Sequence, residues 1–240
     1  MNKYSKFLIY LDPGHGGTSP GATVPKMMEK DLNFAVALAL GPLLLQTGFR
    51  VAYSRKEDKT MTLEQRVTQA NNQNASIYLD IHHNAFTNIH ASGMEVFYKK
   101  GDDLGKKLAE TVLRQLIITL PMVGRGVKTR EKSDGTPYYY TIRNSEAITI
   151  LLESGFLTSP FDFHEMAKPE FPAREAIAIK KGLVEFIDKF VQPEPVDPQP
   201  APTPDLVTPD SKIQSLLIAN RDLKNELHRI ISIAQAALRE

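Results

Sequence analysis

Short apolar runs alternate with amphipathic runs through the first 191 residues, and this alternation restricts the fold more than any other feature. The apolar runs have the length and composition of buried strands. They are KFLIYLD (6–12), FRVAYSR (49–55), SIYLDIH (76–82), GMEVFYK (93–99) and ITILLE (148–153). Apolar residues recur at helical spacing within 32–44, 63–72, 104–116 and 172–190, and a Thr62–Gln65 capping box precedes the second of these runs. Strands separated by helices predict an α/β domain with a mostly parallel, twisted sheet flanked by helices.

A proline-rich segment ends this domain. Prolines stand at positions 193, 195, 198, 200, 202, 204 and 209. Such a composition cannot form a packed core and favours an extended spacer. We therefore expect a catalytic domain over 1–191, a linker over 192–210 and a separate segment over 211–240.

The segment 211–240 has a heptad pattern that predicts a helix. Position a is taken by Ile213, Asn220, Leu227 and Ala234, and position d by Leu216, Leu223, Ile230 and Ala237. Such a stripe is typical of a coiled coil, so we expect homo-oligomers formed through 211–240. A helix that folds back onto the catalytic domain is the alternative, and a membrane-surface helix fits less well because acidic residues offset the basic ones.

The composition excludes several classes of function. The 29 basic and 28 acidic residues give a net charge of +1, which predicts no nucleic-acid partner. The absence of cysteine excludes disulfides, thiolate metal sites and a cysteine nucleophile. No run approaches the ~20 apolar residues of a membrane span. The apolar run after Lys6 is too short for a signal peptide, so we expect a protein that is cytoplasmic as synthesised.

Polar side chains follow three of the expected strands, at the ends where ligands bind in open α/β sheets. They are Asp12 and His15 after the first strand, His82, His83 and Asn84 at the third, and Glu153 at the last. Glu29 precedes the first helix. The topology of such a sheet would bring these groups to one edge.

These residue types suit a zinc hydrolase. Two imidazoles and a carboxylate are a common ligand set for catalytic zinc, which keeps a fourth position for water. Glu153 suits a general base, because desolvation raises the pKa of a carboxyl toward neutrality. Taken singly, a histidine such as His15 after a glycine turn is usually a polar turn residue, and a glutamate such as Glu29 is most often a solvated residue near a helix start. Residue type does not choose between His82 and His83.

Six segments resemble one enzyme family. They are LDPGHGGTSPGA (11–22), EKDLNFAVALAL (29–40), FRVAYSR (49–55), LEQRVTQANNQNASIYLDIHHNA (63–85), SGMEVFYK (92–99) and ITILLESGFLTSP (148–160). In this order they are similar to the zinc-dependent N-acetylmuramoyl-L-alanine amidases of the type-3 family, which hydrolyse peptidoglycan. The resemblance covers about Phe7 to Val191, and the family that it indicates includes endolysins.

The resemblance implies a role for each polar residue. His15, Glu29 and His82 match the family's Zn2+ ligands, and Glu153 matches its catalytic glutamate. His83 stands where the family often has a small residue, and it is the alternative histidine ligand. The bond cleaved would be the amide between N-acetylmuramic acid and the L-alanine of the stem peptide.

Other residues are candidates for supporting roles. Asp12 and Asn84 would orient the imidazoles, or else stabilise turns. Tyr139 would stack on substrate and Arg143 would pair with a stem-peptide carboxylate, or else both belong to a loop that covers the core.

Two other functions compete with the amidase. Another zinc peptidase, such as a carboxypeptidase, would need an arginine for the terminal carboxylate, and Arg143 is the candidate. A catalytically inactive wall-binding protein would not need the set His15, Glu29, His82 and Glu153. Since no signal peptide is expected, the amidase hypothesis favours an endolysin or autolysin that reaches the cell wall after release.

Overall fold

The computed structural model describes residues 2–191, which form a six-stranded sheet with helices on both faces. The strand order is β4-β1-β5-β8-β6-β7. The strands are β1 (Leu8–Pro13), β4 (Arg50–Tyr53), β5 (Ile77–Asn84), β6 (Met94–Tyr98), β7 (Gly124–Lys128) and β8 (Ile148–Phe156). A separate two-stranded hairpin consists of β2 (Thr23–Val24) and β3 (Met27–Met28). The linker and heptad segment expected over 192–240 lie outside the described residues.

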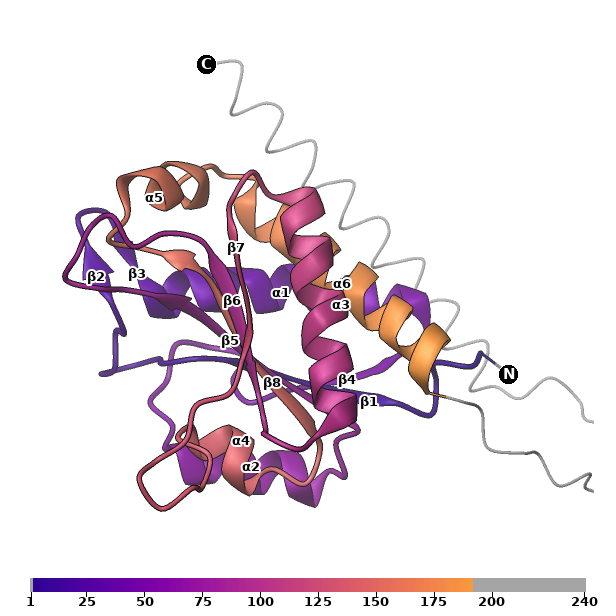
Figure 1. The fold of residues 1–240 in the computed structure, drawn as a ribbon. Helices are drawn as coiled ribbons and strands as arrows, with labels where there is room; N and C mark the ends of the chain where they lie inside the picture. The colour runs from indigo at the N-terminus through magenta and orange to yellow at the C-terminus, as the bar shows by residue number, and fades with distance from the viewer. Residues whose placement is uncertain (1, 192–240) are drawn as a thin grey trace, which may run out of the picture. The chain divides into compact units, whose positions relative to one another are not determined.

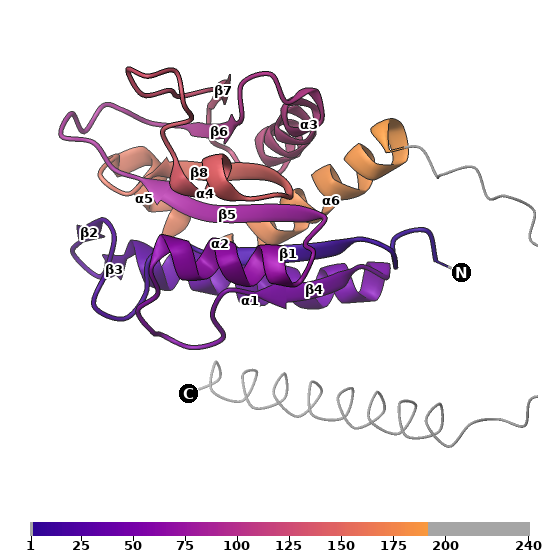
Figure 2. The ribbon, with the colours of Figure 1, turned by 90° about the horizontal axis from the view of Figure 1, so that it is seen from below.

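The helices cover the two faces of the sheet unequally (Figures 1 and 2). Three long helices, α1 (Glu29–Thr47), α3 (Asp103–Thr119) and α6 (Phe171–Phe190), lie on one face. The shorter α2 (Leu63–Asn72) and α4 (Tyr140–Asn144) lie on the other, and α5 (Pro160–Met166) follows β8. Within 2–191, no helix is both long and apolar enough to cross a membrane.

Alternation along the central strands explains why both faces are buried. In β1, Ile9 and Leu11 enter the large apolar core, whereas Tyr10 enters a smaller cluster. Tyr10 and Tyr78 pack there against Val67 of α2, with ring centroids 5.1 Å apart for the two tyrosines. A strand buried on both faces reads as a continuous apolar run, which is what the sequence shows.

The expected fold class is confirmed, with a change at one edge of the sheet. The strands β4, β1, β5 and β8 are parallel, but β6 pairs antiparallel with β8, and β7 is parallel to β6. The sequence pattern missed β7, because GRGVK contains two glycines and two charged residues rather than an apolar run. It also missed α4 and α5, which are too short to show a helical period, and ended β8 three residues early.

The start of α2 agrees with its local sequence signal, whereas α1 begins earlier than expected. Thr62 and Gln65 form both hydrogen bonds of the expected capping box at the start of α2. The first helix begins at Glu29 itself, which the sequence placed ahead of the helix, and it ends at Thr47. The following residue, Gly48, has a φ of 104°, which is left-handed and favours glycine. The site described next depends on where α1 begins.

Candidate metal centre and active site

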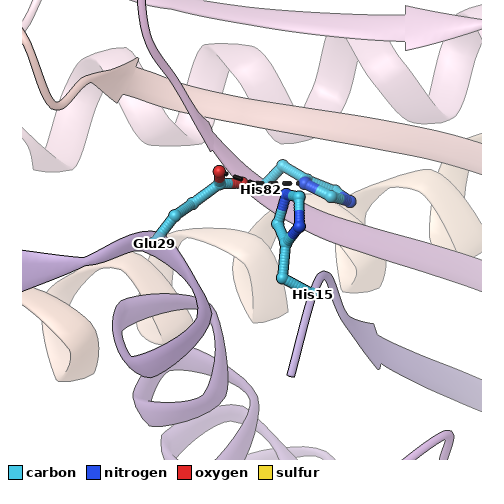
Figure 3. Close-up of side chains that lie close together, drawn as sticks. All are labelled: His15, Glu29 and His82. Atoms are coloured by element: carbon cyan, nitrogen blue, oxygen red, sulfur yellow. Dashed lines mark hydrogen bonds and ion pairs between the residues drawn. The ribbon is translucent and has the colours of Figure 1, made fainter. Parts of the chain in front are cut away.

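Three segments bring two imidazoles and one carboxylate together at the carboxyl edge of the sheet (Figure 3). His15 lies just after β1, Glu29 is the first residue of α1, and His82 lies near the end of β5. The Nε2 atom of His15 is 3.1 Å from Oε2 of Glu29, and Nδ1 of His82 is 2.8 Å from Oε1 of Glu29. One ligand atom from each residue lies within 4.8 Å of the others, so the group could hold a metal ion.

The turn that carries His15 is shaped by its neighbours. His15 has a φ of 62°, in the left-handed region. Arg66 of α2 holds this turn by donating to the backbone carbonyls of Pro13 (3.0 Å) and His15 (2.6 Å). A side chain at Gly14 would come within 2.1 Å of Cε1 of His82, so only glycine lets the His82 ring lie against the turn.

Glu29 is buried and held by several donors. Its Oε2 accepts from the backbone of Ala22 (2.9 Å), and its Oε1 accepts from Nδ2 of Asn33 (3.3 Å). Burial alone would raise the pKa of Glu29, but the hydrogen bonds to His15 and His82 outweigh burial and hold the pKa well below its usual range. The carboxylate is therefore ionised at the centre of the cluster.

Asp80 lies behind His82, and the sequence argument missed it. Its Oδ1 is 3.0 Å from Nε2 of His82, and its Oδ2 accepts from the hydroxyl of Thr141 (2.7 Å). Burial opposes a charged ring, but Asp80 and Glu29 outweigh it and raise the pKa of His82 well above its usual value. Alternation along β5 was the available signal, because residues two apart share a face.

Glu153 lies beside His82 on the neighbouring strand. The two residues are paired in the register between β5 and β8. Burial raises the pKa of Glu153 to about 8, although the charge of His82 lowers it. One carboxylate oxygen, Oε2, is buried and has no hydrogen-bond partner among the described residues. An ionisable group in this state is typical of a catalytic acid or base.

The structure separates the two adjacent histidines. His83 points to the opposite face of the sheet, where its side chain is fully buried. Its Nδ1 is 2.8 Å from Oδ1 of Asn33, and its Nε2 is 3.1 Å from Oε2 of Glu175. The His83 side chain therefore cannot join His15 in one ligand set or touch a substrate. It connects to Glu29 through Asn33, and the backbone N–H of His83 also donates to Oε1 of Glu29 (3.4 Å).

Asp12 and Asn84 contact other groups than the imidazoles. Asp12 accepts from Arg66 Nη1 (2.5 Å) and from the hydroxyl of Tyr78. It thus supports the His15 turn through Arg66 rather than by binding a ring. Nδ2 of Asn84 donates to Oε1 of Glu95 (3.2 Å). The expectation that they hydrogen bond directly to the imidazoles was wrong within the described domain.

Tyr139 and Arg143 differ in their availability to a ligand. Tyr139 packs against Phe97, and burial together with the charge of Glu153 raises the pKa of its hydroxyl to about 12. Nη1 of Arg143 donates to the carbonyls of Pro137 (2.6 Å) and Tyr138 (3.2 Å). Tyr139 therefore lies beside the candidate site, whereas Arg143 stabilises its own loop.

Two histidines and a glutamate that could hold a metal ion, with a buried carboxyl beside them at the carboxyl edge of an α/β sheet, are the arrangement typical of metal-dependent hydrolases. The model of one family, N-acetylmuramoyl-L-alanine amidase, matches residues 9–185. The chain therefore belongs to the N-acetylmuramoyl-L-alanine amidase family, whose members are peptidoglycan hydrolases.

Relatives and solved structures agree with this assignment. The chain is 33% identical over 184 residues to the uncharacterized protein YqiI of Bacillus subtilis (strain 168), covering 75% of this chain and 85% of that protein. It is 31% identical over 202 residues to the germination-specific amidase of the same organism, covering 78% and 83%. An amidase structure from Clostridium difficile 630 matches with a TM-score of 0.71 at 30% identity, covering 78% of this chain and 99% of that one. AmiC2 of Nostoc punctiforme gives 0.70 at 29% identity, covering 77% and 98%.

Proposed function

We propose that this chain hydrolyses the amide between N-acetylmuramic acid and the L-alanine of the stem peptide, using a zinc ion held by His15, Glu29 and His82. The observation that carries the proposal is the convergence of these three side chains next to Glu153. The family assignment supports the choice of bond.

The donor set fits zinc. Two imidazole nitrogens and one carboxylate are typical of catalytic zinc sites, and all three groups come from separate segments that the fold fixes. Asp80 would accept the Nε2 proton of His82, which leaves Nδ1 free to coordinate a metal. When bound, the ion would polarise the scissile carbonyl and lower the pKa of a coordinated water.

Glu153 would move the proton. It accepts a proton from the attacking water and delivers it to the leaving amine of L-alanine, so both steps need the same carboxyl. Without the metal, burial raises the pKa of this carboxyl to about 8, and a bound dication would lower it toward neutrality, where a carboxylate accepts and returns a proton readily. Its free oxygen is not engaged by any described residue, and it can therefore face a water molecule.

The carboxypeptidase alternative has less support. It needs an arginine that is free to bind a terminal carboxylate, and Nη1 of Arg143 is engaged by two backbone carbonyls. In an inactive wall-binding protein there would be no reason for Glu153 to lie beside the three candidate metal ligands.

The products distinguish these functions. Purified protein with zinc is incubated with isolated cell wall, and new chain ends are quantified. Amidase activity gives new L-alanine amino termini, a carboxypeptidase releases C-terminal amino acids, and a wall-binding protein releases neither. Reducing sugar ends without new L-alanine termini would contradict the proposal. The Glu153→Gln variant is the matched control for contaminating hydrolases.

The proposal extends to the part of the chain outside the described residues. From its heptad pattern alone, 211–240 would assemble several catalytic domains, and tethering raises effective concentration on a polymeric wall. Mass measurement of the full chain and of a form ended at Pro204 tests this, since only the longer form should be oligomeric. A monomeric full chain at tens of micromolar would contradict it. Synthesis in the cytoplasm and action on the wall after release stays a prediction.

A further inference from the structure

Two basic side chains lie next to the candidate active site and have no part in the proposed chemistry. Nε of Arg125 donates to Oε2 of Glu95 at 2.8 Å, and Nζ of Lys128 contacts the same oxygen. Both cations come from β7, the edge strand, whereas Glu95 comes from β6. The two cations together lower the pKa of Glu95, despite its burial.

Strand register places this group near the reacting residues. Glu95 pairs with Glu153 across β6 and β8, and Glu153 pairs with His82 across β8 and β5. Directly paired residues point to the same face of a sheet, and adjacent strands are about 4.8 Å apart. The two basic head groups contact Glu95, one strand beyond Glu153, and therefore lie on the face of the candidate site, one to two strand spacings from Glu153.

This cluster has more positive charge than Glu95 neutralises. One carboxylate faces two cations, and their side chains keep exposures of 35% and 36%. Arg125 uses Nε for Glu95 and Nη1 for the carbonyl of Ser92 (3.1 Å), so Nη2 remains available among the described residues. An ammonium has three donors, of which Glu95 takes one from Lys128. Glu95 holds the cations in place without using all of their donors.

We infer that Arg125 and Lys128 form a subsite for the carboxylate on the second residue of the stem peptide. The inference rests on the proposed function, which places the L-alanine amide at the metal cluster and Glu153. An extended chain advances about 3.5 Å per residue, so a carboxylate on the next residue lies within about 7 Å of the scissile amide. That reach falls within the one to two strand spacings, about 5–10 Å, that separate Glu153 from the basic pair.

Two arginines behind the His15 turn do not offer such a subsite. Arg66 is buried in an ion pair with Asp12, and it also holds the turn at His15. Arg55 is buried and donates to backbone carbonyls, including those of Pro13 and Lys30. Arg125 and Lys128 combine partial exposure, surplus donors and a fixed position.

The test uses two soluble substrates that differ in one group. N-acetylmuramoyl-L-alanyl-D-isoglutamate with its γ-carboxyl blocked as a methylamide carries the α-carboxylate. The D-isoglutamine analogue, blocked in the same way, carries a neutral amide at that place, so neither substrate keeps a second carboxylate. We expect kcat/KM to favour the carboxylate substrate by about tenfold, the value of one partly exposed charge-assisted contact, mainly through KM. Lys128→Met should reduce this preference severalfold, and the charge-preserving Lys128→Arg should keep most of it.

Matched controls separate the subsite from other effects. Lys181→Met removes an exposed lysine from α6, on the opposite face of the sheet, and should leave the preference unchanged. Arg125→Gln is the second test variant, and thermal unfolding checks that each variant is folded. Equal kcat/KM for the two substrates in the wild-type protein, or an unchanged preference in folded Lys128→Met and Arg125→Gln, would overturn the inference. Failure to cleave either substrate would instead contradict the proposed function.

Discussion

His82 and His83 are neighbours in the chain, yet they belong to two different environments. The side chain of His82 retains 19% exposure and faces Glu29 and Asp80, whereas that of His83 is fully buried between Asn33 and Glu175. Successive residues of a strand point to opposite faces, so one strand supplies a group to the candidate metal centre and another to the packed interior. The comparison shows that β5 has one chemical face and one structural face, and mutations can test this division.

The largest effect on activity should follow from the same substitution at the two neighbouring positions. His82→Gln removes one of the three candidate ligands, so the protein should lose bound zinc and, with it, activity. His83→Gln should keep zinc and activity but lower the unfolding free energy by roughly 1–3 kcal/mol, because Glu175 loses its buried partner. Metal analysis, wall digestion and denaturant unfolding measure these properties. Zinc loss in folded His83→Gln but not in His82→Gln would reverse the assignment.

The next largest effect concerns the proton carrier. Glu153→Gln keeps the shape of the side chain but cannot accept a proton, so kcat should fall by roughly 10²–10⁴-fold. Zinc content should remain at the wild-type level, because Glu153 is not one of the three convergent groups. The measurement is kcat with parallel metal analysis. A variant that loses its zinc would show that Glu153 is a ligand.

The site residues that the sequence predicted differ from those it missed in how local the sequence pattern around them is. His15, Glu29, His82 and Glu153 stand beside local patterns, namely a glycine turn, a helix start and two strand ends. Asp80 has a weaker local signal, because only the alternation along β5 places it on the same face as His82. To choose between His82 and His83 as the ligand, one must know which face of β5 packs against α1 and α6.

Other features depend on pairing between distant segments, which no local pattern reports. Glu95 reaches the site only because β6 runs antiparallel to β8. Arg125 and Lys128 reach it because β7, with its glycines and charges, forms an edge strand that periodicity does not reveal. The parallel core of the sheet was predictable because its strands are buried on both faces. The edge at β7 was not predictable, because that strand lacks an apolar pattern.

A smaller effect should follow from loss of the support behind His82. Asp80→Asn keeps the size of the side chain but replaces a charged acceptor near Nε2 of His82 with a neutral amide. Partners behind a metal-binding histidine typically contribute 10–100-fold to metal affinity or activity, and we expect a loss in roughly that range. Zinc titration gives the affinity. The matched change on the structural face is Asn33→Asp, which alters the partner on the other side of Glu29.

Thr141→Val removes the hydroxyl that donates to Asp80. If Thr141→Val lowered zinc affinity as much as Asp80→Asn does, Asp80 would act through its orientation rather than through its charge.

The smallest effect is on stability, and it should depend on pH. In the folded protein the pKa of Glu153 is raised from 4.5 to about 8, chiefly by burial. A raised pKa means that the folded state binds this proton more tightly than the unfolded state does. The contribution to stability is therefore present below about pH 4.5 and is lost as the pH rises through about 8. Glutamine resembles the protonated carboxyl and does not ionise, so the Glu153→Gln variant should keep this contribution to stability as the pH rises.

In protein stripped of metal by a chelator, Glu153→Gln should therefore unfold at a higher temperature than the wild type at pH 8 and above. The two proteins should converge near pH 4, where the wild-type carboxyl is protonated in both states. Thermal unfolding monitored across this pH range gives the comparison, with Lys181→Met as a surface control that should follow the wild type. A constant difference between Glu153→Gln and the wild type at every pH would contradict the raised pKa. If the two unfolding temperatures converge at low pH, the ionisation of Glu153 opposes folding, and the chemical face of the sheet keeps this group at a cost in stability.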